Sequence, residues 1–294
     1  FYLTLCYDAL NDYDNAVNES KIFLGKEPDN WVMHLALSEI YEKTKNESKR
    51  NEEVKRTREI LEKNVNDGSK EPKEYFILCQ IYRNQNRIGD AIGVIENMKL
   101  IPVDKGTKRD AHYLLANLYY EAKKLDKVEE ELLMTLRIDP DFHEANNFLG
   151  YYFAENNKNL DEAIQLINKA LKAQPNNGAY IDSLGWVYYK KAQAEGRDDY
   201  LTEALKKLLE AVQLLEEPDI YEHIGDVHYS LGHWDEAIDV WRKAQSLYKK
   251  MPGNEPQIEN ITTKLERIEK LISMEKTGLK VIANHVDVEN VVKP

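Results

Sequence analysis

Seven segments of this chain share one pattern of residue types, and this internal repeat limits the fold more than any other feature of the sequence. A leucine-type residue recurs at intervals of 34 to 41 residues. The seven positions are Leu3, Leu37, Leu78, Leu115, Leu149, Leu184 and Ile224. Self-similarity at a period of about 20 to 50 residues is typical of arrays of stacked units rather than of one globular core.

A small residue directly follows each of these positions, and an aromatic residue or histidine comes three places after the small one. The small residues are Thr4, Ser38, Cys79, Ala116, Gly150, Gly185 and Gly225. The aromatic positions are Tyr7, Tyr41, Tyr82, Tyr119, Phe153, Tyr188 and His228. Gly185 lies inside the helical pattern "DSLGWVYYKK", where glycine costs about 1 kcal/mol relative to alanine. We interpret it as a point where two helices approach closely.

A second amphipathic segment follows each aromatic position and begins with alanine or valine. These residues are Ala16, Val54, Ala91, Val128, Ala163, Ala204 and Ala237. Each unit is therefore predicted to be two amphipathic helices, A and B, joined by a polar turn such as "NKNLD". Because one pair cannot bury its apolar face alone, neighbouring pairs must stack. Residues 43–53, 103–108 and 192–200 stretch the spacing, and we expect them to form longer loops.

The C-terminal part departs from the repeat. Five apolar residues recur at three- and four-residue spacing within residues 254–276 and predict one apolar stripe on a helix. They are Ile258, Ile261, Leu265, Ile268 and Ile272. The simplest role for this helix is to cap the last repeat, since a terminal unit needs a polar outer face. Residues 277–294 fit no repeat and leave three alternatives, namely a disordered tail, a strand on the array or a link to a further domain.

The repeat resembles the tetratricopeptide repeat, whose pattern is W-x2-L-G-x2-Y, then A-x3-F, then A and P. The likeness covers about residues 1–250 and is strongest in "YEHIGDVHYSLGHWDEAIDVWRKA". It implies an all-α, right-handed α-solenoid of about seven helix-turn-helix units, with a capping helix over residues 252–276. The repeats are predicted at residues 1–30, 31–71, 72–108, 109–142, 143–177, 178–217 and 218–251, before the tail 277–294.

A closer likeness covers about residues 143–245. The stretches "NNKNLDEA" and "DSLGWVYY" resemble bacterial tetratricopeptide proteins, many of which carry an export signal or a lipid anchor and serve the cell envelope. This implies a periplasmic or outer-membrane-associated location, with the cytoplasm as the alternative. Because Phe1 stands where an initiating Met would, we expect the native N-terminus to be missing.

In the tetratricopeptide fold, helix A lines the concave face, and the resemblance therefore implies a binding groove on that face. Residues beside the small position, or one turn away from it, would face this groove. The predicted partner-binding residues are Gln80, Tyr113, Asn117, Tyr120, Asn147, Tyr151, Asp182, Trp186, Tyr189, Glu222 and Asp226, and Phe76 and Arg83 lie on neighbouring turns. Aromatic residues suit recognition, asparagine can pair with a peptide backbone, and the acids favour a basic ligand. The alternative, given equal weight, is that these aromatics pack on one another and tighten the array.

Composition limits the partners and the chemistry. The formal net charge of −12 argues against nucleic acid or an anionic membrane as the main partner. The apolar runs are too short to span a bilayer, and Cys6 and Cys79 make neither a metal motif nor a disulfide framework. His223, Asp226 and His228 suggest a metal site, but zinc needs three or four converging ligands. His228 also stands at the internal aromatic position, so no metal is predicted.

The sequence contains no nucleotide-binding loop, nucleophile elbow or zinc-protease motif. We therefore predict a non-enzymatic scaffold without cofactors, which binds a peptide or protein partner in its concave groove and serves a bacterial envelope assembly. The alternative is a regulatory or substrate-binding segment of a larger enzyme whose catalytic domain lies outside this sequence. Self-association, with residues 277–294 in a neighbour's groove, is a third alternative.

Overall fold

The computed structural model describes residues 2–276, which contain fifteen α-helices and no strand. The chain divides into two compact units, residues 1–138 with α1 to α8 and residues 139–294 with α9 to α15. The helices are α1 (Tyr2–Ala9), α2 (Tyr13–Leu24), α3 (Trp31–Lys43), α4 (Glu47–Asn66), α5 (Pro72–Asn84), α6 (Ile88–Met98), α7 (Lys105–Glu121), α8 (Leu125–Ile138), α9 (His143–Glu155), α10 (Leu160–Ala173), α11 (Gly178–Glu195), α12 (Asp198–Leu214), α13 (Pro218–Ser230), α14 (Trp234–Tyr248) and α15 (Glu255–Lys276).

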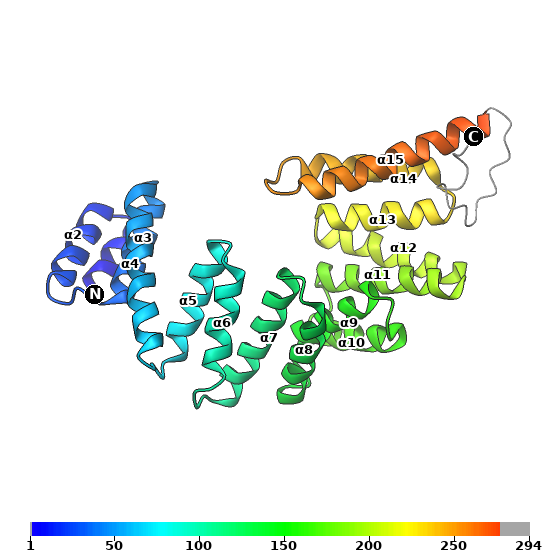
Figure 1. The fold of residues 1–294 in the computed structure, drawn as a ribbon. Coiled ribbons are helices and arrows are strands. Elements are labelled where there is room, and N and C mark those ends of the chain that lie inside the picture. Colours follow the sequence, from blue (N-terminus) through cyan, green and yellow to red (C-terminus); the bar gives the residue numbers. More distant parts are fainter. Residues whose placement is uncertain (1, 277–294) are drawn as a thin grey trace, which may run out of the picture. The chain divides into compact units, whose positions relative to one another are not determined.

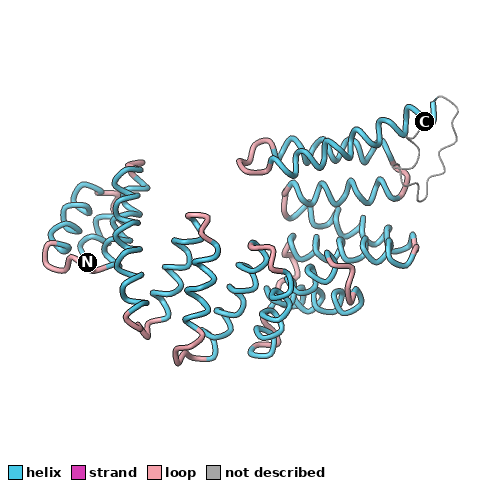
Figure 2. The backbone as a smooth tube through the Cα atoms, in the orientation of Figure 1, coloured by secondary structure: helices cyan, strands magenta, loops and turns pink. Residues whose placement is uncertain are grey.

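Consecutive helices form hairpins inside each unit, and short loops join them (Figures 1 and 2). The pairs are α1–α2, α3–α4, α5–α6 and α7–α8 in the first unit, and α9–α10, α11–α12 and α13–α14 in the second. We call the first helix of each pair the A helix and the second the B helix. Within each unit, every B helix also packs on the next A helix, as α4 does on α5 and α12 on α13. The predicted all-α fold of stacked helix pairs is confirmed.

Every A–B turn contains a residue in the left-handed backbone conformation. These residues are Asn11, Lys45, Asn86, Lys123, Asn157, Gly196 and Gly232, with φ between 49° and 76°. In six of these seven turns the next N–H reaches back to the carbonyl at the repeated aromatic position, as Arg87 N does to Tyr82 O at 2.8 Å; in the α11–α12 turn, Arg197 N instead reaches Ala192 O. This is the hydrogen bond of a helix that ends in a left-handed residue. Except in the longer α11, which continues to Glu195, the aromatic position therefore lies at the last turn of helix A.

The glycine at 185 lies where α11 meets its own B helix, α12. A Cβ at this position would lie 2.7 Å from Leu208 Cγ and 3.2 Å from the carbonyl oxygen of Ala204. Both distances are shorter than ordinary van der Waals contact. The lower helix propensity of glycine is therefore offset by a closer approach of the two helices and better packing of Leu208, which is fully buried.

The prediction of three long loops is wrong, because the structure places most of the residues concerned in helices. Helix α3 ends at Lys43 and α4 already begins at Glu47, so residues 43–53 lengthen α4 at its start. Helix α7 begins at Lys105, inside residues 103–108, and residues 192–200 lengthen α11 and α12. Extra turns of helix satisfy their own backbone hydrogen bonds, which a long loop does not.

Helix α15 packs where the A helix of a further repeat would lie, against α14. Its Ile261 and Ile268 are fully buried in a cluster with Ala237, Trp241 and Tyr248. The predicted apolar stripe therefore faces the preceding helix pair. The predicted tail, residues 277–294, lies outside the described residues, and so does its suggested role in self-association. No helix in residues 2–276 combines the length and the apolar character needed to cross a membrane.

Candidate partner-binding surfaces

The predicted groove residues all lie on A helices, and they divide between the two units. Gln80, Tyr113, Asn117 and Tyr120 belong to α5 and α7 of the first unit. Asn147, Tyr151, Asp182, Trp186, Tyr189, Glu222 and Asp226 belong to α9, α11 and α13 of the second unit. The two groups have different surroundings, so each is described within its own unit.

A cavity of about 340 Å³ lies between α5 and α7 in the first unit. Its lining residues are Phe76, Cys79, Gln80, Arg83, Asn84 and Leu114. The first five come from α5, and Leu114 comes from α7. Gln80, Arg83 and Asn84 are exposed, whereas Phe76 and Leu114 are half-buried. The cavity thus has an apolar part and a polar, solvent-facing part, as binding pockets of this size commonly do.

One side of this cavity carries an ion pair that joins the two A helices. Arg83 Nε on α5 donates to Glu121 Oε2 on α7 at 3.1 Å, and Nη2 of the same guanidinium donates to Glu121 Oε1. Burial raises the pKa of the Cys79 thiol to about 12, so this lining residue is a neutral thiol at physiological pH. It contributes packing rather than reactivity.

The predicted residues of α7 lie next to the cavity but do not line it. Tyr113 and Asn117 are half-buried, and Tyr120 is 38% exposed. The Asn117 side-chain amide donates to the Tyr113 carbonyl at 2.8 Å, within its own helix. Of the four residues predicted in the first unit, Gln80 is the one that lines the cavity.

In the second unit, the expectation that Trp186 lines an open groove is wrong. The Trp186 side chain is only 8% exposed, because α9 and α13 contact α11 on both sides. Its ring stacks on His223 of α13 at 4.1 Å between centroids, and on Tyr189 at 4.9 Å. Its Nε1 donates to Glu155 Oε1 of α9 at 2.5 Å. Trp186 therefore holds three A helices together, which agrees with the packing alternative.

Asp182 and Tyr189, two more predicted groove residues, are buried beside Trp186 with 9% and 7% exposure. Asp182 Oδ1 lies 2.8 Å from His223 Nδ1. Burial lowers the pKa of His223, but the nearby carboxylates of Asp182, Asp226 and Asp219 outweigh that effect and raise its pKa above 6.5. The surroundings therefore favour the imidazolium form, whose positive charge is attracted to the face of the indole.

This contact predicts a pH dependence for the stability of the second unit. A histidine whose pKa is raised on folding contributes stability that is complete below pH 6.5 and is lost as the pH rises through the raised value. Replacing His223 with glutamine, which is neutral at every pH, should cost about 1.5 kcal/mol at pH 6. The cost should shrink at alkaline pH. Urea unfolding of both proteins from pH 6 to alkaline pH checks this, and a constant difference would contradict it.

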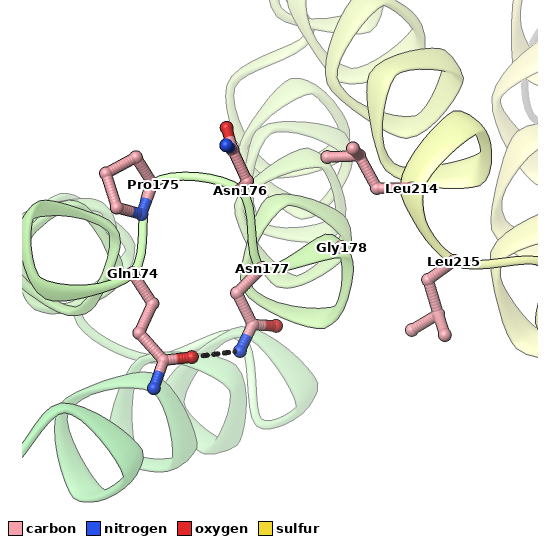
Figure 3. Close-up of a pocket in the computed structure, with 7 residues that line it drawn as sticks. All are labelled: Gln174, Pro175, Asn176, Asn177, Gly178, Leu214 and Leu215. Atoms are coloured by element: carbon pink, nitrogen blue, oxygen red, sulfur yellow. Dashed lines mark hydrogen bonds between the residues drawn. The ribbon is translucent and has the colours of Figure 1, made fainter.

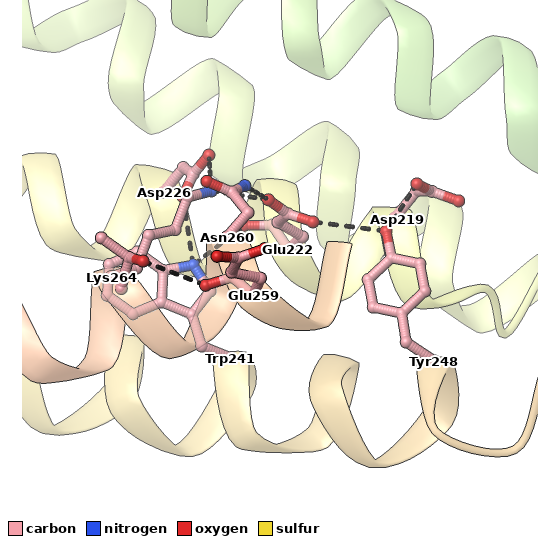
Figure 4. Close-up of polar contacts among 9 residues, drawn as sticks. Asp219, Glu222, Asp226, Trp241, Tyr248, Glu259, Asn260 and Lys264 are labelled. Carbon is pink, nitrogen blue, oxygen red and sulfur yellow. Dashed lines mark hydrogen bonds and ion pairs between the residues drawn. The ribbon is translucent and has the colours of Figure 1, made fainter. Parts of the chain in front are cut away.

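The predicted acids of α13 already have partners from α15 (Figure 4). Lys264 Nζ lies 2.7 Å from Glu222 Oε1, and 2.7 and 2.9 Å from the two carboxylate oxygens of Asp226. Its ammonium also lies 5.6 Å from the centroid of the Trp241 ring, and Asn260 donates to Glu222 Oε1 at 2.8 Å. The sequence does not reveal this site. Helix α15 is not part of the repeat, so no regular sequence spacing relates its residues to those of α13.

Asn147 and Tyr151 of α9, the remaining predicted residues, are half-buried. Asn147 Oδ1 is buried and accepts no hydrogen bond from the described residues. Both side chains are more exposed than that of Trp186.

A second hollow, of about 510 Å³, lies in the second unit between the α10–α11 loop and the end of α12 (Figure 3). Its lining residues are Gln174, Pro175, Asn176, Asn177, Gly178, Leu214 and Leu215. Asn177 Nδ2 donates to Gln174 Oε1 at 2.8 Å, and the Asn177 side chain also caps α11. No charged side chain lines this hollow. Its residues serve as helix-end and loop residues of the repeat, so nothing in the sequence marks this hollow as a site.

No group of three or more His, Cys, Asp or Glu side chains in the described part of the chain is placed to hold a metal ion. The rings of His228 and His233 lie 5.7 Å apart, and His228 is half-buried. Burial lowers the pKa of His228, and the neighbouring His233 lowers it further. His228 is therefore neutral at physiological pH and packs at the aromatic position of its repeat.

Comparison with known proteins identifies the repeat. Residues 129–178 match the Tetratricopeptide repeat family. The fold resembles the crystal structure of a tetratricopeptide repeat protein from Parabacteroides merdae, with a TM-score of 0.62 and 14% sequence identity over 90% of this chain and 96% of that one. This chain contains a tetratricopeptide repeat at residues 129–178 and shares the fold of tetratricopeptide repeat proteins.

Two further proteins extend the comparison. This chain is 30% identical over 134 residues to TPR repeat-containing protein PA4667 of Pseudomonas aeruginosa, and the aligned region covers 45% of this chain and 22% of that protein. This chain thus spans about a fifth of that relative's length. The fold also resembles a chain of the APC/C hetero-tetramer Cut9–Hcn1, with a TM-score of 0.61 and 15% identity over 85% of this chain and 44% of that one.

Proposed function

We propose that this chain is a non-enzymatic protein-interaction scaffold whose first unit binds an extended peptide on its A helices. The observation that carries the proposal is the cavity between α5 and α7. Tetratricopeptide arrays expose rows of side chains along their A helices, and a gap between two such helices offers a place for a partner's side chain. The proposal concerns the residues in this chain and requires no cofactor.

The lining of the cavity suits a large apolar side chain on a peptide backbone. Phe76 and Leu114 supply the apolar surface on opposite helices. Gln80 and Asn84 follow one another at a four-residue spacing on α5 and are exposed, so their amides can donate to and accept from peptide groups. An apolar anchor with a few polar contacts around it is the usual arrangement at a peptide-binding hot spot.

The second unit supports this location by contrast. Where the first unit has a cavity between A helices, α9, α11 and α13 are joined by the buried side chain of Trp186. The acids that favoured a basic ligand, Asp182, Glu222 and Asp226, are paired with His223 and Lys264 of the same chain. A basic partner for this face is therefore not part of the proposal.

Filling the cavity should weaken peptide binding. Leu114→Trp places an indole against Phe76 and should weaken binding at least tenfold, the equivalent of one lost apolar anchor. The assay is selection from a display library of short random segments joined to a carrier at both ends. Wild type should enrich segments with a large apolar residue, and Leu114→Trp should not.

The matched control is Leu133→Trp, which adds the same side chain at a 44% exposed position of α8 in the same unit. It should enrich the same segments as wild type. Thermal unfolding by circular dichroism confirms that both variants are folded. Equal enrichment by wild type and Leu114→Trp would refute the cavity as the binding site.

We also propose that the scaffold serves a bacterial envelope assembly. The support is the likeness of "NNKNLDEA" and "DSLGWVYY" to envelope-associated bacterial tetratricopeptide proteins, together with a relative from Pseudomonas aeruginosa. Fractionation of cells that express the native full-length protein tests this proposal. Recovery with the cytoplasmic fraction alone would contradict it.

A further inference from the structure

We infer that the α5–α7 cavity selects a peptide segment in which an acidic side chain flanks the large apolar one. This inference rests on the proposed function and names the chemistry of its partner. Its starting point is the charge of the lining, because the six residues that line the cavity include one cation, Arg83, and no acid. A ligand seated there meets the guanidinium directly.

Three hydrogen-bond donors lie on one face of α5 at the solvent side of the cavity. Gln80, Arg83 and Asn84 are separated by three and four residues, so they occupy neighbouring positions on the helix surface. All three are exposed. A carboxylate accepts several hydrogen bonds at once, and a guanidinium with flanking amides can supply them. A lysine or arginine at the same place would instead face Arg83 and be repelled.

The ion pair with Glu121 leaves room for a second carboxylate. Glu121 accepts from Nε and Nη2 of Arg83, while Nη1 carries two further N–H groups. The side chains of Arg83 and Glu121 are 48% and 31% exposed, and exposed ion pairs contribute little to stability. A ligand carboxylate can therefore bind beside Glu121 or replace it at small cost. Glu121 itself is not among the lining residues.

The test uses the same display library, in which both ends of every random segment are joined to the carrier and no free terminus exists. Wild type should enrich aspartate or glutamate within a few positions of the apolar residue. Arg83→Gln should keep the apolar preference and lose the acidic one. Glu121→Gln, which removes the competing carboxylate but keeps Arg83, should keep both preferences.

An affinity measurement follows on one selected segment, made as an acetylated and amidated peptide with either aspartate or asparagine at the acidic position. Arg83→Gln should weaken the aspartate peptide roughly tenfold, the effect of one charge-assisted hydrogen bond. It should leave the asparagine peptide unchanged. Because Arg83 is exposed, the substitution should leave the thermal unfolding of the protein unaltered.

Two results would overturn the inference while leaving the proposed function intact. One is an apolar preference without acidic enrichment in wild type. Another is that Arg83→Gln binds the aspartate peptide as tightly as wild type does. Absence of any apolar preference is a different outcome, since it would contradict the proposed function itself.

Discussion

Replacing Trp186 with alanine should lower the free energy of unfolding of the second unit by about 3 kcal/mol or more. Loss of a buried tryptophan side chain typically costs about 3 to 5 kcal/mol, because the cavity it leaves collapses only in part. Trp186 is 8% exposed and contacts residues of α9 and α13. A tryptophan that served only to bind a partner would have almost no effect on stability when replaced.

The measurement is urea unfolding followed by far-ultraviolet circular dichroism, which avoids the fluorescence change caused by the substitution itself. Trp186→Phe is the matched variant, because it keeps an aromatic ring against His223 but removes the Nε1 hydrogen bond to Glu155 and part of the buried ring. It should cost about 1 to 2 kcal/mol, less than Trp186→Ala. A change below about 0.5 kcal/mol for Trp186→Ala, the range of ordinary surface substitutions, would show that this side chain does not hold the A helices together.

The contacts inside each helix pair could be predicted from sequence because they are set by local spacing. The small position, represented by Gly185, lies against the B helix of the same unit, where Leu208 fills the space of the missing Cβ. The aromatic position, represented by Tyr82, lies on the last turn of helix A, and its carbonyl accepts the hydrogen bond that closes the turn. Both features repeat with the helical period, so one sequence is enough to reveal them.

The distance between A helices of neighbouring units could not be predicted in this way. Gln80 and Trp186 occupy corresponding positions of their repeats, yet Gln80 is exposed and lines a cavity whereas Trp186 is buried. The difference depends on how closely the neighbouring A helices approach, which is a property of several helices together. Helical periodicity specifies which face of α11 a side chain occupies, but it does not specify what covers that face.

Contacts with the capping helix were hidden for a related reason. Lys264 reaches Glu222 and Asp226 across 42 and 38 residues, and no repeat relates α15 to α13. The apolar stripe of α15 could be recognised from its spacing, because burial follows the helical period. The polar contacts beside that stripe depend on the orientation of α15 on α13 and α14, so the acids at 222 and 226 looked available for a ligand.

Gly225→Val should destabilise the second unit by about 3 kcal/mol or more, because its side chain would occupy space that Trp241 already fills. A Cβ at Gly225 would lie 2.9 Å from Trp241 Cγ and closer still to Cδ1 and Nε1 of the same ring. The ring cannot move aside freely. It is 2% exposed, its Nε1 donates to Asp226 at 3.1 Å, and Lys264 of α15 covers its face. Overpacking a filled core costs about 1 to 3 kcal/mol, and displacing the ring adds the loss of its own contacts.

The matched control is Gly93→Ala in α6, where a Cβ would meet no atom within 4 Å. Alanine there should stabilise the first unit by about 0.5 to 1 kcal/mol, the ordinary gain in helix propensity. Urea unfolding of the two variants therefore separates the two effects of a helical glycine, its low propensity and the room it leaves for a neighbouring helix. If Gly225→Val were as stable as wild type, Trp241 would have to repack without loss. The close contact between α13 and α14, on which the docking of α15 depends, would then not be required for folding.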